Sequence, residues 1–334
     1  MKKNYNIAIV GATGAVGADM LRVLDERNFP INNLRLLASA RSIGKKLLFK
    51  GKEIEVEELT HNSFNDIDIA LFSAGASRSK EFAPSAVKAG AVVVDNSSAF
   101  RMDPDVPLVV PEVNPEAALN HKGIIANPNC STIIMVVPVA ALHQAKKLKR
   151  VIASTYQAVS GAGVQGMKEL ELQTKQVMNN EEVKPEKFPY QIAFNLFPHI
   201  DVFLENDYTK EEMKMVFETR KIMNLPELQV NCTCVRLPVF RAHSESLLLE
   251  FEEDITPGEA KSILQSAPGV KVLDNVSQNI YPMPLTASGI DEVLVGRIRQ
   301  DISRNDKKGL SIFIAGDQLL KGAALNAIQI AELL

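Results

Sequence analysis

Two patterns of apolar residues alternate along the first third of the chain. Short uninterrupted apolar runs, such as Ile7–Val10, are typical of strands buried on both faces. Between them, apolar residues recur every three or four positions, as expected for amphipathic helices. Short apolar strands separated by helices predict a doubly wound parallel sheet. The expected strands are residues 7–10, 34–37, 67–72 and 91–94, the helices are residues 15–27 and 79–89, and residues 53–56 belong to a small irregular section.

The pattern changes near Asn127. The expected strands after this point are longer and contain more polar residues. Such segments suit a mixed or mostly antiparallel sheet with one solvated face. Thr209 and Glu212 have the spacing of a capping box at the start of a helix. The expected strands are residues 147–159, 230–235, 246–251, 292–298 and 310–314. The expected helices are residues 132–142, 167–178, 209–223 and an amphipathic terminal helix at 317–334, with a polar surface segment at 178–189.

The composition of the 334-residue chain disfavours several classes of function. Lysine and arginine number 37 against 40 acidic residues, a net charge of −3, whereas nucleic-acid binders usually carry a basic excess. The three cysteines, Cys130, Cys232 and Cys234, have neither a disulfide framework nor zinc-ligand spacing, so no metal is expected. No apolar run approaches the ~20 residues that span a bilayer. Glycines interrupt the apolar stretch at residues 7–18, which fits a strand and turn better than a signal peptide. A cytoplasmic protein without a membrane partner is predicted.

A glycine turn follows the first expected strand and opens the first expected helix. Gly11, Gly14 and Gly17 would let backbone N–H groups approach a pyrophosphate at the helix N-terminus. The alternative is a plain tight turn. At the end of the second strand an NAD enzyme usually has an acidic residue, but here Ser39–Ser42 stands in its place. Arg41, flanked by hydroxyls, suits a 2′-phosphate and predicts NADP, unless it belongs only to a solvated loop.

Cys130 precedes an apolar helix in the segment Asn127–Thr132. A thiol in the first turn of a helix feels the helix dipole, which lowers its pKa and favours the nucleophilic thiolate. A buried structural cysteine is the alternative, but the nicotinamide site predicted from the glycine turn favours a nucleophilic role. A cysteine thiolate adds to an aldehyde, and hydride loss to nicotinamide then gives a thioester. Cys232 and Cys234 lie within an expected strand and are interpreted as structural.

Six motifs together carry a family resemblance. They are GATGAVG at 11–17, SSAFR at 97–101, NPNCST at 127–132, TYQAVSGAG at 155–163, ExxK at 211–214 and RLPVFRAH at 236–243. With these motifs the chain resembles the aspartate-β-semialdehyde dehydrogenases over essentially its full length. The resemblance implies NADPH-dependent reduction of L-aspartyl-4-phosphate to L-aspartate-4-semialdehyde and phosphate, through a cysteine thioester. It also implies a role in the synthesis of lysine, threonine, methionine and diaminopimelate.

The resemblance further implies residue roles. Cys130 would be the nucleophile, His243 the general acid/base and Gln157 an orienting residue. Arg236 would bind the substrate α-carboxylate and Glu211 the ammonium group, with Glu212 as the alternative to Glu211. The phosphate site would comprise Arg101, Asn129 and Lys214. The cofactor contacts would be Gly11, Thr13, Gly14, Ala15, Val16, Gly17, Arg41, Ser42, Ser160, Gly161 and Gln318.

The residue types independently suit this substrate. A carboxylate is best held by the planar fork of an arginine, and a histidine titrates near neutrality. Arg236 and His243 are seven residues apart, so Arg236 can end one strand and His243 can begin the next, in one cleft. Glu211 and Lys214 could instead form a helix-surface ion pair.

These observations predict an α/β protein with two domains. A Rossmann-type NADP-binding domain at residues 1–128 would be completed by the helix at 317–334, and residues 129–315 would form an α+β catalytic and dimerisation domain. The resemblance implies a homodimer or homotetramer. One alternative is N-acetyl-γ-glutamyl-phosphate reductase, although an acylated amine would not require Glu211. Another is a catalytically inactive NADP-sensing protein, which the intact Cys130 and His243 disfavour.

Overall fold

The computed structural model describes residues 4–334 and divides into two compact units. One unit combines the chain up to Asn129 with Ala323–Leu334, and the other is Cys130–Gly322. Residues 1–3 of the predicted first domain lie outside the described residues. Across residues 4–334, no helix is both long enough and apolar enough to cross a membrane. The same residues contain no cluster of three or more potential metal ligands.

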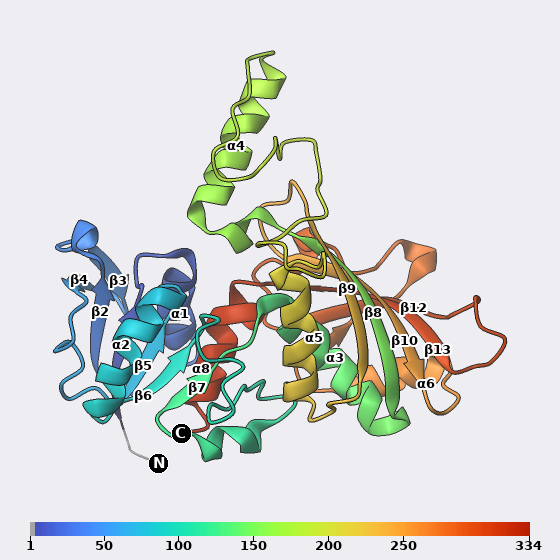
Figure 1. Cartoon of the computed structure of the whole chain (residues 1–334), viewed down its shortest axis with the longest axis horizontal. Coiled ribbons are helices and arrows are strands. Elements are labelled where there is room, and N and C mark those ends of the chain that lie inside the picture. The colour runs from blue at the N-terminus through green and yellow to red at the C-terminus, as the bar shows by residue number, and fades with distance from the viewer. Residues whose placement is uncertain (1–3) are drawn as a thin grey trace. The chain divides into compact units, whose positions relative to one another are not determined.

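The first unit is built on a seven-stranded sheet in the order β3-β4-β2-β1-β5-β6-β7. All neighbouring strands are parallel except β3 and β4. Its elements, labelled in Figure 1 where there is room, are β1 (Tyr5–Val10), α1 (Ala15–Glu26), β2 (Ile31–Ala38), η1 (Ala40–Ser42), β3 (Lys46–Phe49), β4 (Lys52–Glu58), β5 (Ile69–Phe72), α2 (Ala76–Lys88), β6 (Val92–Asp95), η2 (Pro115–Asn120), β7 (Ile124–Ala126) and α8 (Leu325–Ala331).

The central strands of this sheet are buried on both faces, which explains their uninterrupted apolar runs, whereas β3 and β4 are largely exposed. The side chains of β1 and β5 alternate between the two faces, and all four residues of β5 are buried. Phe82, Ala83 and Ala86 of α2 pack with one set of these strand residues. The chain leaves β1 first for β2 on one side and later for β5 on the other. This change of direction puts the turn after β1 at a topological switch point, where doubly wound sheets bind ligands.

The second unit is built on a six-stranded mixed sheet in the order β11-β12-β13-β10-β8-β9. The pairs β8–β9 and β11–β12 are parallel and the others antiparallel. Its elements are α3 (Cys130–Lys146), β8 (Leu148–Gln157), η3 (Val159–Ala162), α4 (Val164–Met178), α5 (Lys210–Ile222), β9 (Gln229–Arg236), β10 (His243–Phe251), α6 (Pro257–Ser266), β11 (Val270–Val272), η4 (Val276–Gln278), α7 (Pro284–Ala287), β12 (Val293–Gln300), β13 (Gly309–Gly316) and a π-helical turn, η5 (Leu320–Ala324), which runs into the first unit.

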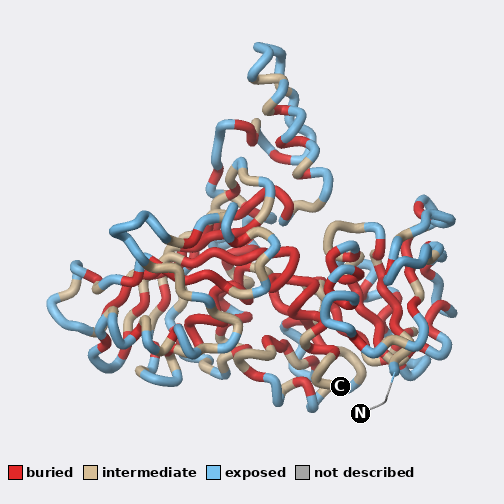
Figure 2. Tube along the Cα trace, turned by 180° about the vertical axis from the view of Figure 1, so that it is seen from behind, coloured by how far each residue is buried: buried red, intermediate tan, exposed pale blue. Residues whose placement is uncertain are grey.

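The two faces of this second sheet differ in burial. Helices α3, α5 and α6 pack against the sheet, and α3 contacts both of the others. On β8 and β10, fully buried residues alternate with half-buried ones, as expected for a sheet with one less-covered face. Tyr156 of β8 and Phe313 of β13 are both half-buried, and their rings stack on each other across β10. Helix α4 and the segment after it extend away from this sheet and are largely exposed (Figures 1 and 2).

Several predicted elements need correction. The segment predicted as irregular at residues 53–56 forms part of β4, because it pairs in register with β2 and β3. The terminal helix does not begin at Asp317: residues 318–319 form a turn, the π turn η5 follows, and α8 spans only Leu325–Ala331. Nor is this segment amphipathic, since residues 318–328 are all buried. The short strands β3, β7 and β11 and helix α6 were not predicted from the sequence.

Candidate active site

The ends of three neighbouring strands bring together three of the predicted residues. Gln157 ends β8, Arg236 ends β9 opposite it, and His243 begins β10 on the other side of β8. The seven-residue separation of Arg236 and His243 therefore has the predicted effect of placing both at one sheet edge. Ala242 precedes His243 in the left-handed backbone region, with φ of 69°. That conformation is strained for a non-glycine residue, and such strain clusters at functional sites.

His243 is fully buried and hydrogen-bonded through one ring nitrogen only. Its Nδ1 accepts from the backbone N–H of Ala158 at 3.1 Å, so the neutral ring carries its proton on Nε2. Within residues 4–334, Nε2 is buried and has no hydrogen-bond partner. Burial, and secondarily the charge of Arg236, lowers the pKa of His243 to about 3. The neutral imidazole thus presents an Nε2–H donor that has no acceptor among residues 4–334.

Arg236 is a buried cation beside this histidine. Its side chain is 6% exposed, and Nη1 donates to the carbonyl of Ala158 at 2.5 Å. Burial lowers the pKa of Arg236 and Glu211 opposes that effect, but a guanidinium stays charged in proteins. A Cβ atom on Gly161 would lie 3.1 Å from Arg236 Nη1 and 3.3 Å from His243 Nε2. The backbone of η3 therefore passes close to both side chains, and a glycine provides the space.

Glu211 and Glu212 have different surroundings. Glu212 forms the capping box of α5 with Thr209, as predicted, and its other oxygen accepts from the N–H of Cys234 at 2.9 Å. Glu211 instead accepts from Gln157 Nε2 at 3.2 Å. Both carboxyl oxygens of Glu212 thus accept from backbone N–H groups, whereas Glu211 faces the side chains at the sheet edge.

Lys214 forms the ion pair with Glu211 that helical spacing allows, at 3.1 Å, and a second pair with Asp201 at 2.8 Å. Burial acts to lower the pKa of Lys214, but the two carboxylates raise it above its ordinary value. The lysine is therefore firmly cationic and lies next to Glu211.

Cys130 is the first residue of α3 and is only partly buried. Cys232 and Cys234 lie within β9, with exposed fractions of 2% and 0%, and burial raises the pKa of both thiols well above the ordinary range. Of the three cysteines, only Cys130 combines access with a helix N-terminus, the environment that favours a thiolate.

Ser160 and Gln318, predicted as cofactor contacts, are joined to the same region. Gln318 Nε2 donates to Ser160 Oγ, and its Oε1 accepts from the N–H of Ala242 at 2.8 Å. Gln318 thereby links the turn after β13 to η3 and to the strained residue before His243.

The first unit holds the other predicted residues. A Cβ on Gly11 would lie 2.3 Å from the carbonyl oxygen of Ser73, and one on Gly17 would lie 2.4 Å from that of Gly11, so both turn positions require glycine. Gly14 is the N-cap of α1. Thr13 Oγ1 lies 3.4 Å from Ser42 Oγ, which connects the glycine turn to the loop carrying the exposed Arg41. The first turn of α1 contains the predicted contacts Ala15, Val16 and Gly17.

Arg101 is buried in this unit and is held by backbone carbonyls. It donates to Asn96 O at 2.8 Å and to Asn127 O at 3.0 Å. The Asn127 side chain in turn bonds to Asn96 and to Asn326 of α8. Asn129, the last residue of this unit before Cys130, is 5% exposed. This asparagine network was not predicted from the sequence, although three asparagines near strand and helix ends were a visible signal.

Glu245 was also missed. It lies two residues after His243 on the same strand face, opposite Thr155, and is fully buried. Neither carboxyl oxygen has a hydrogen-bond partner in the described part of the chain. Burial and the charge of Glu211 raise its pKa well above the ordinary value, so the neutral acid is favoured. A glutamate at a buried position of an alternating strand was the available signal.

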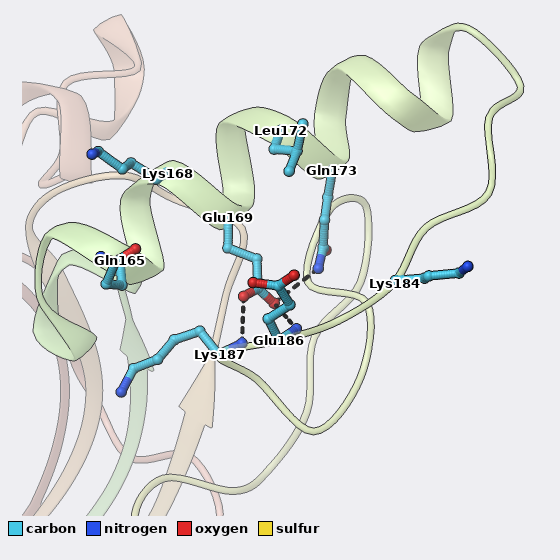
Figure 3. A pocket seen from close by; sticks show the side chains of 8 residues that line it. All are labelled: Gln165, Lys168, Glu169, Leu172, Gln173, Lys184, Glu186 and Lys187. Atoms are coloured by element: carbon cyan, nitrogen blue, oxygen red, sulfur yellow. Dashed lines mark hydrogen bonds between the residues drawn. The ribbon is translucent and has the colours of Figure 1, made fainter.

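A cavity of about 310 Å³ lies elsewhere, between α4 and the segment that follows it. Figure 3 shows its lining residues, none of which was a predicted site residue: Gln165, Lys168, Glu169, Leu172, Gln173, Lys184, Glu186 and Lys187. The buried Glu169 accepts from the N–H groups of Lys187 at 2.5 Å and Glu186 at 3.3 Å. These bonds hold the returning segment against the helix.

Comparisons with known proteins bear on both units. Residues 6–121 match the family model "Semialdehyde dehydrogenase, NAD binding domain", and residues 139–321 match "Semialdehyde dehydrogenase, dimerisation domain". An aspartate-semialdehyde dehydrogenase of Aquifex aeolicus is 59% identical, covering 99% of this chain and 98% of the relative. The chain belongs to the aspartate-semialdehyde dehydrogenase family. The predicted family, the predicted oxidoreductase of amino-acid biosynthesis and the predicted fold class are thereby confirmed.

Further members of the family have similar sequences and structures. The Bacillus subtilis aspartate-semialdehyde dehydrogenase is 53% identical, covering 99% of this chain and 98% of the relative. The structure of aspartate semialdehyde dehydrogenase II from Vibrio cholerae, complexed with ASA, matches with a TM-score of 0.97 and 47% identity, covering 100% of this chain and 98% of that one. The Candida albicans enzyme, solved with NADP, has a TM-score of 0.76 and 26% identity, covering 99% and 98%. These comparisons support a nicotinamide cofactor, a small-molecule substrate and a dimerisation domain.

Proposed function

We propose that this chain reduces L-aspartyl-4-phosphate to L-aspartate-4-semialdehyde with NADPH, releasing phosphate, and catalyses the reverse reaction. The single observation that carries the proposal is the sheet edge at which Arg236, Gln157 and His243 lie at the ends of three neighbouring strands, with Glu211 hydrogen-bonded to Gln157. A zwitterionic acyl phosphate needs a cation for its carboxylate, an anion for its ammonium group and a donor for a developing oxyanion. This edge supplies all three types of group.

Arg236 and Glu211 are the proposed substrate anchors. Arg236 is buried and charged, and its guanidinium can give two parallel hydrogen bonds to the α-carboxylate. Glu211 faces the same side chains through Gln157, whereas the backbone bonds of Glu212 leave it no such role. We assign the ammonium site to Glu211. Lys214, Arg101 and Asn129 are the proposed phosphate-binding residues.

Cys130 is the proposed nucleophile. Its thiolate attacks the acyl carbon, the C–O bond to phosphate breaks, and the phosphate leaves with the electron pair, giving a thioester. The reduced nicotinamide, when bound, supplies the hydride that converts the thioester carbon to the thiohemiacetal level. Collapse of the thiohemiacetal releases the aldehyde and regenerates the thiolate.

His243 is the proposed donor to the reacting oxygen. In the reductive direction, negative charge develops on the former carbonyl oxygen, and a preorganised N–H in a water-free site stabilises it strongly. The Nε2–H of His243 is buried and unpartnered among residues 4–334, and Nδ1 is held by Ala158, so the ring need not reorient to donate. Gln157 is the proposed orienting residue beside it.

The proposed cofactor is NADP, bound through the glycine turn, Arg41 and Ser42. The turn has the strand–turn–helix setting of a dinucleotide site, and Gly11 and Gly17 allow its tight packing, because a Cβ at either position would collide with a backbone carbonyl. Thr13 and Ser42 connect the turn to the loop of Arg41. The proposed nicotinamide-side contacts are Ser160, Gly161 and Gln318.

Arg41→Ala tests this cofactor proposal. The variant should weaken NADPH binding at least tenfold and leave NADH binding nearly unchanged, since the lost partner is the extra phosphate. Fluorescence titration of both nucleotides measures the ratio. Equal weakening of both would remove Arg41 from the 2′-phosphate site.

We further propose that residues 1–128 act as the cofactor domain and residues 129–315 as the catalytic and dimerisation domain of a homodimer. The half-buried face of the second sheet, which carries Tyr156 and Phe313, is the proposed interface between two copies. A tetramer built from two such dimers remains the larger alternative, which sedimentation analysis resolves. A cytoplasmic location stays a prediction.

The deciding experiment is phosphate-dependent reduction of NADP with aspartate semialdehyde, followed at the nicotinamide absorbance. We expect turnover that requires phosphate and is absent with N-acetyl-glutamate semialdehyde. Preference for the acetylated substrate would assign the N-acetyl-γ-glutamyl-phosphate reductase reaction instead. NADP binding without turnover of either substrate would indicate a sensor.

A further inference from the structure

The π-helical turn η5, Leu320–Ala324, packs against the proposed nucleophile. Such turns are rare and are frequent at functional sites. A Cβ atom on Gly322 would lie 2.9 Å from Cys130 Cβ and 3.3 Å from Cys130 Cα. Both atoms belong to the start of α3 rather than to the end of a flexible side chain. A side chain at position 322 would therefore have to displace Cys130 itself.

The turn has little freedom to move away. Gly322 N donates to the carbonyl of Asp317 at 3.1 Å, and Asp317 is completely buried. The Asp317 carboxylate accepts from Arg241 Nε at 2.6 Å and from Gly289 N at 2.7 Å. It also accepts from the N–H of Leu319 at 3.0 Å. This anchored corner holds the π turn in place beside Cys130.

Conformational freedom does not explain the glycine. Gly322 is not among the residues with positive φ, so the backbone there would accept an alanine. The reason for a glycine is the close approach to Cys130. Reactions of oriented groups are sensitive to position, and a displacement of about 1 Å can cost about 10²-fold in rate.

We infer that Gly322 is a positioning residue for the Cys130 nucleophile, because its missing side chain lets the anchored π turn set the place of the thiol at the start of α3. The inference rests on the proposed function of Cys130. It goes beyond that function by assigning a residue that is not among the proposed substrate, phosphate or cofactor contacts.

Gly322→Ala is the test. We expect kcat to fall roughly 10- to 100-fold while the KM for NADPH stays within twofold, because the thiol moves and the glycine turn does not. The alkylation rate of Cys130 with iodoacetamide, measured against pH by mass spectrometry, should have its midpoint shifted upward by at least a few tenths of a pH unit. The shift follows because a displaced thiol loses part of its interaction with the helix N-terminus.

Two matched controls separate positioning from damage to the fold. Gly258→Ala adds the same methyl group to α6, where the nearest atom is 4.0 Å away, and should leave kcat and the alkylation profile unchanged. Gly296→Ala places a Cβ 2.0 Å from the carbonyl oxygen of Leu273 and should lower the melting temperature without shifting the alkylation midpoint.

Three outcomes would overturn the inference. They are a Gly322→Ala enzyme with kcat within twofold of the parent, an unshifted alkylation midpoint, and a profile indistinguishable from that of Gly296→Ala. If Gly322→Ala does not fold, Asp317→Asn loosens the anchor without adding atoms beside Cys130. A smaller upward shift of the midpoint in that variant supports the inference, and no shift rejects it. Because alkylation needs no turnover, failure of the proposed reaction in the parent protein is detected separately.

Discussion

Two buried glutamate–glutamine pairs in the second unit look alike and differ in what surrounds them. Gln157 Nε2 donates to Glu211 at 3.2 Å at the sheet edge, and Gln173 Nε2 donates to Glu169 at 2.9 Å on α4. The α4 pair is tied to the backbone: Glu169 accepts from Lys187 N, and Gln173 Oε1 accepts from Ile192 N at 2.7 Å. A polar pair satisfied by main-chain groups holds two segments together.

At the sheet edge, side chains provide the partners instead. Glu211 pairs with Lys214, and Gln157 Oε1 accepts from Thr155 Oγ1 at 2.9 Å. Beside them, His243 Nε2 is buried without a partner within residues 4–334. An unpartnered buried donor costs free energy, which a ligand can recover by accepting from it. Buried polar groups thus indicate a binding site where their partners are side chains and where one hydrogen-bonding atom has no partner among residues 4–334.

The largest expected effect is that of Cys130→Ser. If the sheet edge and the start of α3 form the reactive centre, turnover should fall at least 10³-fold, because a hydroxyl is a far weaker nucleophile than a thiolate at neutral pH. The melting temperature and NADP binding should change little. Steady-state kinetics with separate nucleotide titration checks this. Near-normal activity would eliminate the covalent route.

Arg236→Lys is the next largest expected effect. The charge is kept, but an ammonium makes a point contact where a guanidinium gives two parallel hydrogen bonds. We expect kcat/KM to fall about 10²-fold, about 2.7 kcal/mol of transition-state stabilisation. A lysine enzyme with unchanged kcat/KM would take Arg236 out of the site, and a parallel loss of NADP affinity would indicate a structural effect.

Local sequence signals predicted most of the fold and much of the site. The short apolar runs predicted the strands buried on both faces, and the spacing of Arg236 and His243 predicted two strand ends at one edge. Other features depend on tertiary packing. Residues 317–334 have the periodicity of a single helix, but residues 318–328 are all buried and residues 320–324 form a π turn. The tautomer of His243 depends on Ala158, which is 85 residues away in sequence, and its neutral state depends on burial.

The pH dependence of stability tests the unpartnered histidine. The pKa of His243 is about 3 in the folded protein and about 6.5 when unfolded, so the unfolded state binds a proton between these values. The contribution to stability is complete above pH 6.5 and is lost as the pH falls toward 3. His243→Asn retains an acceptor for Ala158 N–H but does not titrate. Between pH 7.5 and 5, denaturant unfolding of the parent should lose about 2 kcal/mol more than that of the variant. Parallel curves would contradict the low pKa.

The smallest expected effects come from the two glutamates themselves, and they address the comparison directly. Glu169→Gln replaces an acceptor-only carboxylate, which faces backbone N–H groups, with an amide that brings its own donors. We expect a loss of about 1–2 kcal/mol in unfolding free energy and faster proteolysis at residues 184–187, with kcat/KM within twofold of the parent. Denaturant curves and limited proteolysis measure the first two quantities.

Glu211→Gln is the matched change at the sheet edge, and the opposite result is expected. The amide keeps the size of the side chain and a bond to Gln157, but it removes the charge proposed to bind the substrate ammonium. We expect kcat/KM to fall roughly tenfold, about 1.4 kcal/mol, mainly through KM. The unfolding free energy should change by at most about 1 kcal/mol, because the side chain keeps its size and Lys214 keeps its ion pair with Asp201. If Glu211→Gln destabilises the fold and spares catalysis while Glu169→Gln does the reverse, then partner type does not separate a binding site from a structural clamp in this protein.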